Sequence, residues 1–124
     1  MGTTRKQGSL YTSYSGPLAT LEFGHPASNS LNSELLRRLC DEIRALGNNP
    51  EVSVILLQSE GDRAFCAGAS FDELLQVSTP EQSTEFFSGF ARLINAMRTC
   101  PRPIVGKVHG KAVGGGVGLI AACD

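Results

Sequence analysis

The sequence has almost no excess of charge of either sign and no long apolar run. Its 11 Lys and Arg residues are matched by 12 Asp and Glu residues, which gives no reason to expect nucleic acid as a partner. No uninterrupted apolar segment approaches the roughly 20 residues of a membrane-spanning helix. Residues 1–8 are polar and lack the apolar region of a signal peptide. These absences argue against nucleic-acid binding, membrane spanning and secretion.

Closely spaced metal-binding or redox residues are also missing. The two histidines lie outside any H-E-x-x-H pattern, and the four cysteines form no C-x-x-C pair: Cys40, Cys66, Cys100 and Cys123. We therefore expect no metal site, reduced thiols and a cytoplasmic protein. Cys66 is expected to be a buried, unreactive thiol, and His109 a packed residue at the end of a strand.

The sequence does contain many glycines, and they gather in two corners. The first corner is RAFCAGASF (63–71) and the second is HGKAVGGGVGL (109–119). Each follows an apolar, strand-like run and leads into a helix-like one. Glycine permits positive φ and close approach of a ligand to the backbone. One corner alone is better explained as a tight turn, but two together can direct two backbone N–H groups at one developing negative oxygen.

The apolar pattern of the whole chain predicts a single α/β domain. Strands are expected over residues 10–14, 18–23, 52–57 and 104–108, the third of them buried on both faces. Helices are expected after an N-cap at Asn32 or Ser33, near Phe71, after an N-cap at Thr79, and near Gly116. The third helix is expected to bury one stripe of side chains, namely Phe86, Phe87, Phe90, Leu93, Ile94 and Met97.

Three segments of the chain resemble the enoyl-CoA hydratase/isomerase (crotonase) family. They are AFCAGA (64–69), GGG (114–116) and AACD (121–124), and HPASNSLN (25–32) is similar to that family's first CoA-binding loop. The resemblance runs from about residue 9 to residue 124 and implies a crotonase-like spiral of ββα units. A crotonase-like domain would be about twice as long. We therefore expect residues 1–124 to form only its N-terminal part, truncated and inactive alone.

The resemblance also implies roles for individual residues. The N–H groups of Ala69 and Gly115 would form an oxyanion hole for a thioester enolate. Coenzyme A would be contacted, mainly through backbone atoms, by Ala27, Ser28, Ala67, Gly68, Ser70, Phe71 and Gly114. Phe71 is expected either to form a wall of the ligand pocket or to pack in the core. The implied partner is an acyl-CoA thioester, with no separate cofactor because CoA belongs to the substrate. The full-length protein would be a homotrimer or hexamer.

The sequence departs from the family at the acid/base position. Crotonase-type hydratases are known for two glutamates; the first is matched here by Gly118, and the second would lie beyond Asp124. Glycine can neither take nor give a proton, so the two-glutamate mechanism does not carry over. A one-carboxylate hydratase, an isomerase, a CoA-thioester hydrolase and a catalytically silent acyl-CoA binder remain open. The run around Gly114 looks most like methylglutaconyl-CoA hydratases of leucine breakdown.

Overall fold

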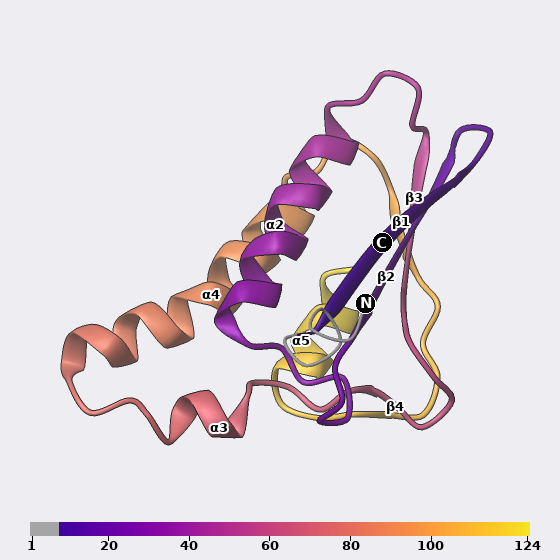
Figure 1. The fold of residues 1–124 in the computed structure, drawn as a ribbon. Coiled ribbons are helices and arrows are strands. Elements are labelled where there is room, and N and C mark those ends of the chain that lie inside the picture. Colours follow the sequence, from indigo (N-terminus) through magenta and orange to yellow (C-terminus); the bar gives the residue numbers. More distant parts are fainter. Residues whose placement is uncertain (1–7) are drawn as a thin grey trace.

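The computed structural model describes residues 8–124, so most of the segment expected to lack a signal peptide lies outside the described residues. The chain forms a triangular spiral in which a sheet, a second small sheet and a layer of helices make the three sides (Figure 1). In chain order, the elements are β1 (Ser9–Ser15), β2 (Leu18–Gly24), α2 (Ser33–Gly47), β3 (Val54–Ser59), β4 (Ala64–Cys66), α3 (Phe71–Leu74), α4 (Pro80–Arg98), β5 (Ile104–Gly106), β6 (Lys111–Ala112) and α5 (Gly115–Ala121).

The large sheet has the order β1-β2-β3-β5, and the small sheet pairs β4 with β6. β1 is antiparallel to β2, whereas the pairs β2–β3, β3–β5 and β4–β6 are parallel. Each turn of the spiral therefore adds a strand to the large sheet, an extended segment at the second side and then a helix. The expected α/β spiral is confirmed, while the small sheet was not predicted because its strands are very short.

The two long helices begin where the sequence predicts. Asn32 caps α2 by accepting a hydrogen bond from the Leu35 N–H at 2.8 Å, and α2 ends at Gly47. Thr79 and Gln82 form a capping box at the start of α4, with Pro80 at its first position. The helix boundaries are therefore set by local chemistry.

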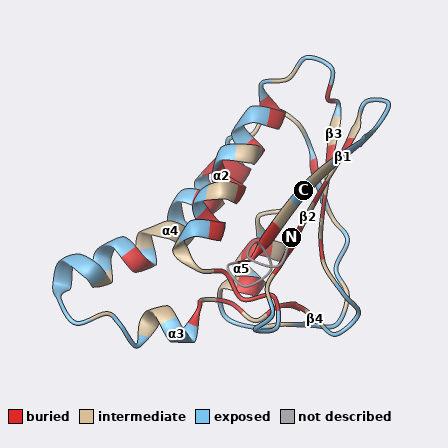
Figure 2. Cartoon of the chain, viewed as in Figure 1, coloured by how far each residue is buried: buried red, intermediate tan, exposed pale blue. Residues whose placement is uncertain are grey.

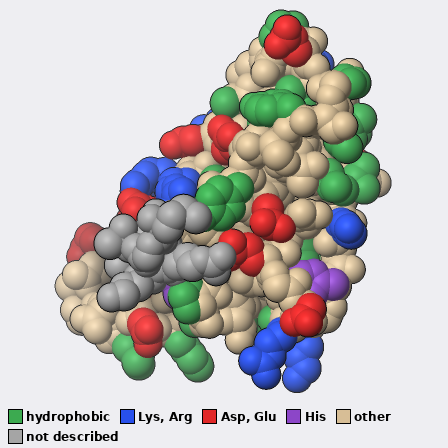
Figure 3. Space-filling model, turned by 45° about the vertical axis from the view of Figure 1, so that its right-hand side comes forward, with side chains coloured by type: hydrophobic (Ala, Val, Ile, Leu, Met, Phe, Trp, Pro, Cys, Tyr) green, Lys and Arg blue, Asp and Glu red, His purple; other side chains and the backbone are tan. Residues whose placement is uncertain are grey.

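The core lies between the inner face of the large sheet and the helices (Figure 2). The inner face of β3 is buried at Ile55, Leu57 and Ser59, whereas the alternate residues are only half-buried. The prediction that both faces of this strand are buried is therefore wrong for the described chain. Apolar side chains are exposed on the sheet side of the molecule (Figure 3), and Val105 of β5 is 49% exposed.

The predicted buried stripe of α4 is only partly correct. Phe86, Leu93 and Met97 are buried, but Phe87 is 57% exposed. The first part of α4 projects away from the sheet (Figure 1), so the core reaches less of this helix than its apolar pattern predicts. Strand ends also differ from expectation, most clearly in β3, which spans Val54–Ser59 rather than 52–57, and in β5, which ends at Gly106 rather than at residue 108.

The alternation along β3 supplies a matched test of the core. In the full-length protein, Leu57→Ala is expected to lower the free energy of unfolding by about 2–5 kcal/mol, because it leaves a cavity in a fully buried site. Leu56→Ala, one residue away on the half-buried face, is expected to cost clearly less. Denaturant unfolding monitored by circular dichroism measures both. Equal losses would contradict the placement of the core.

Candidate functional site

The small sheet brings the two glycine corners together. Its strands pair Ala64 with Lys111, and the Val113 N–H donates to the Cys66 carbonyl at 3.0 Å. Gly68 has a φ of +91°, and a Cβ there would lie 2.8 Å from the Val113 carbonyl oxygen and 3.2 Å from the Gly115 nitrogen. Only glycine fits this contact, so the second corner lies directly on the first.

The Ala69 N–H points away from the strand partner of the first corner, Leu31. Ala69 forms a parallel bridge with Leu31, in which the Leu31 N–H donates to Gly68 at 2.8 Å and the Ser70 N–H donates to Leu31 at 3.2 Å. In this arrangement the N–H of the middle residue points away from the partner strand. Cys66 is bonded to the second corner on that opposite side. Among the described residues, the Ala69 N–H donates no hydrogen bond.

The Gly115 N–H lies at the first position of α5. Gly114 precedes it with a φ of +54° and provides no side-chain cap. The neighbouring amides are occupied, because Gly116 donates to Val113 at 2.9 Å and Val117 donates to Gly114 at 3.0 Å. The Gly115 N–H donates to no other described residue. The corners thus present two N–H groups, on adjoining segments, that donate to no other described residue.

The predicted CoA-binding loop lies against the first corner. Ala27 and Ser28 are exposed, and the Ser28 carbonyl accepts the Ala67 N–H at 3.1 Å. Asn29, which the sequence analysis missed, is buried and donates through Nδ2 to the carbonyls of Glu60 at 2.8 Å and Ala64 at 2.9 Å. Its φ is +57°, a conformation that asparagine adopts more readily than most residues. That preference is the signal that could have identified Asn29 as the residue fixing this loop.

Ser70 and Phe71 differ sharply in exposure. Ser70 is 8% exposed, and its Oγ accepts the Glu73 N–H at 3.2 Å, so its side chain caps α3. Phe71 is 77% exposed, so it does not pack in the core of the described chain. Its ring is therefore accessible to a ligand, together with the 78% exposed Leu75.

Gly118 faces a hollow that contains no glutamate. The hollow has a volume of about 470 Å³ and is lined by Ile94, Arg98, Gly118 and residues 121–124. A Cβ at Gly118 would meet only the Ile94 Cδ1 at 3.9 Å, which is ordinary contact. The Asp124 Oδ2 accepts the Ile104 N–H at 2.8 Å and so serves the sheet. In the part of the chain that the structure describes, no acid/base carboxylate faces Gly118 from this lining other than that engaged group.

The remaining candidates are built into the packing. Burial raises the pKa of the Cys66 thiol and outweighs the opposing effect of the Gly68 N–H, which donates to the Sγ at 3.4 Å. The thiol therefore stays protonated near neutral pH. The His109 ring packs edge-on against Phe65 with ring centroids 6.4 Å apart, as predicted for a packed residue. Over residues 8–124, no helix is both long and apolar enough to cross a membrane.

An α/β spiral that joins two glycine corners at its small sheet defines the crotonase-like class of fold. An enoyl-CoA hydratase of Bacillus anthracis has this fold, with a TM-score of 0.87 and 26% identity over 93% of this chain and 45% of its own. The profile of the enoyl-CoA hydratase/isomerase family matches residues 14–124, and the chain belongs to that family.

Two relatives whose names state an activity are also similar to this chain. Human mitochondrial methylglutaconyl-CoA hydratase is 35% identical over 96 residues, covering 77% of this chain and 28% of its own length. A crotonyl-CoA hydratase of Syntrophomonas wolfei is 31% identical over 108 residues, covering 86% of this chain and 41% of its own length. The chain thus spans less than half of each of these relatives. The cytoplasmic location stays a prediction.

Proposed function

We propose that the full-length protein is an enoyl-CoA hydratase or isomerase that stabilises a thioester enolate with the N–H groups of Ala69 and Gly115. The observation that carries this proposal is that both amides are unoccupied among the described residues and belong to adjoining corners. A carbonyl that becomes an enolate gains negative charge on oxygen, and fixed backbone donors stabilise that charge without rearrangement.

The CoA part of the substrate would lie along the first corner. The exposed Ala27 and Ser28 loop, tied to Ala67, offers backbone atoms to the adenine and pantetheine portions. Gly68 and Gly114 leave room for the thioester, and the exposed Phe71 ring would form a pocket wall. The buried Ser70 contributes by shaping α3 rather than through its hydroxyl. In this proposal CoA arrives with the substrate, and no separate cofactor takes part.

The proton-transfer step would depend on residues other than Gly118. A hydratase with one carboxylate, or an isomerase with one base, needs no carboxylate at position 118. Either enzyme would act in fatty-acid or leucine breakdown. The hollow beside Gly118 also supports a second candidate, a silent acyl-CoA-binding protein without an acid/base pair. A CoA-thioester hydrolase requires a base or nucleophile outside the groups described above. Assembly as a trimer or hexamer is part of the proposal.

One experiment separates these reactions. The full-length protein is incubated with crotonyl-CoA and, separately, with 3-methylglutaconyl-CoA, and the products are identified by mass spectrometry and thiol titration. Hydration adds the mass of water, hydrolysis releases free CoA thiol, and isomerisation gives a product of unchanged mass that separates from the substrate in liquid chromatography. Calorimetry with an acyl-CoA detects binding without turnover, which is the expected result for the silent binder. If the protein neither turns over nor binds either thioester, the proposal is wrong.

A further inference from the structure

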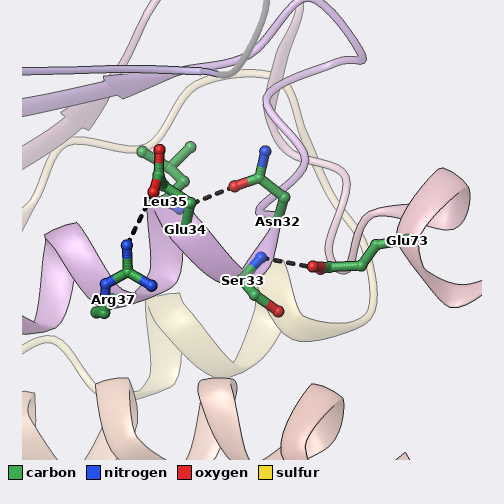
Figure 4. Close-up of polar contacts among 6 residues, drawn as sticks. All are labelled: Asn32, Ser33, Glu34, Leu35, Arg37 and Glu73. Carbon is green, nitrogen blue, oxygen red and sulfur yellow. Dashed lines mark hydrogen bonds and ion pairs between the residues drawn. The ribbon is translucent and has the colours of Figure 1, made fainter. Parts of the chain in front are cut away.

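Glu73 lies where the first corner meets the start of α2. Its Oε1 accepts the Ser33 N–H at 2.9 Å, and Ser33 is the first residue of α2 (Figure 4). Asn32 occupies a different amide of the same helix end, that of Leu35. The amides of a helix's first turn lack partners within the helix, and a carboxylate is favoured there. Glu73 therefore joins α3 to α2 through a charge-assisted hydrogen bond.

This contact continues an interrupted ladder of hydrogen bonds. Leu31 donates to Gly68 and accepts from Ser70, which are two successive rungs of a parallel pair. The next rung of a regular parallel ladder would join the Ser33 N–H to the Ser70 carbonyl. That carbonyl instead accepts the Leu74 N–H at 3.0 Å, because the chain has turned into α3. The Glu73 carboxylate supplies the acceptor for Ser33 in its place.

The three contacts hold the first corner on both sides of Ala69. Gly68 and Ser70 flank Ala69 directly, and Glu73 fixes the turn that follows. α3 itself has only four residues and no buried side chain, so packing contributes little to its position. The Glu73 to Ser33 bond is therefore the link that keeps the end of the corner against α2.

We propose that Glu73 is a positioning residue that fixes the direction of the Ala69 N–H through α3 and the Ser33 amide. This inference rests on the proposed function, since it assigns the purpose of the contact to thioester binding. Misplacement of a reacting group by about 1 Å can cost on the order of 100-fold in rate. Loss of the hydrogen bond between Glu73 and Ser33 would shift the Ala69 N–H without deleting it. We therefore expect a smaller loss of rate than removal of an N–H donor would cause.

The test compares three variants of the full-length protein. Glu73→Ala removes the acceptor, and Glu73→Gln keeps an oxygen for the Ser33 N–H. Glu81→Ala is the matched control, because Glu81 is an exposed glutamate in the first turn of α4. We expect Glu73→Ala to lower kcat for the active thioester by roughly tenfold. Glu73→Gln should recover most of that loss, and Glu81→Ala should leave kcat unchanged.

A second readout separates this inference from the proposed function. Hydrogen exchange of the Ser33 and Ser70 amides should accelerate in Glu73→Ala and stay slow in Glu73→Gln, whether or not the protein turns over a thioester. If the wild-type protein is inactive, the proposed function fails, but the exchange rates still test whether Glu73 holds α3 against Ser33. Unchanged exchange in Glu73→Ala would overturn the positioning role of Glu73. Unchanged kcat for Glu73→Ala in an active protein would also overturn it.

Discussion

Gly115→Pro is expected to lower kcat of the full-length protein by about 10²–10³-fold on its active thioester, because proline removes one of the two proposed oxyanion donors. Gly115 is the first residue of α5, a position where proline suits a helix, and its N–H donates to no other described residue. The change therefore deletes the proposed oxyanion donor without deleting a hydrogen bond to another described residue. Steady-state kinetics measure the loss, after circular dichroism has shown an intact fold.

Gly115→Ala is the matched control for that substitution. A Cβ at this position would lie 2.3 Å from the Phe90 Cε1, so either variant forces the Phe90 ring to shift. Alanine keeps the N–H, and the ratio of the two kcat values therefore isolates the donor from the crowding. If proline and alanine reduce kcat equally, the Gly115 N–H does not bind the oxyanion and the assignment is wrong.

Gly118→Glu is expected to raise hydration of crotonyl-CoA, by up to about 10²–10⁴-fold where the carboxylate is well placed. The new side chain would enter the hollow beside Ile94, where a Cβ meets only ordinary contact. Glutamate also favours a helix more than glycine does, so the fold should tolerate the change. Enoyl absorbance measures the rate.

Gly118→Gln separates proton transfer from the added bulk. Glutamine has nearly the same size as glutamate but cannot act as a general acid or base, so it should leave the hydration rate near that of the wild type. Equal rates for the two variants would contradict the proposed acid/base role of this position. If the wild-type protein already hydrates crotonyl-CoA as fast as two-glutamate relatives do, Gly118 does not lower the rate.

The elements with local signals were predictable from the sequence. Asn32 and Thr79 cap their helices, Gly47 ends α2, and the apolar spacing of α2 matches its buried face, because these features depend on neighbouring residues. The small sheet was not predicted, since strands of three and two residues are too short to show a period. The exposed Phe87 was missed because helical periodicity identifies a face but cannot show how far the core extends along it.

The two glycine corners of the candidate site could be predicted from the sequence, but the residues that hold these corners in place could not. The spacing of glycines marked Gly68 and Gly115, because small residues are needed wherever two backbones approach closely. Asn29 and Glu73 act on partners far along the chain, Ala64 and Ser33, so no local pattern identifies them. Whether Ala69 and Gly115 bind an oxyanion stays a prediction.

The side-by-side arrangement of three successive turns has a consequence for folding. The segments that meet around Ala69 begin near Ser28 and end at Gly115, so the site joins parts of the chain that are synthesised at different times. Contacts between distant segments carry a loop-closure cost and form late. A folding intermediate with only the first two turns in place would hold one N–H donor and lack the other. Ligand affinity should therefore not appear before β6 has docked onto β4.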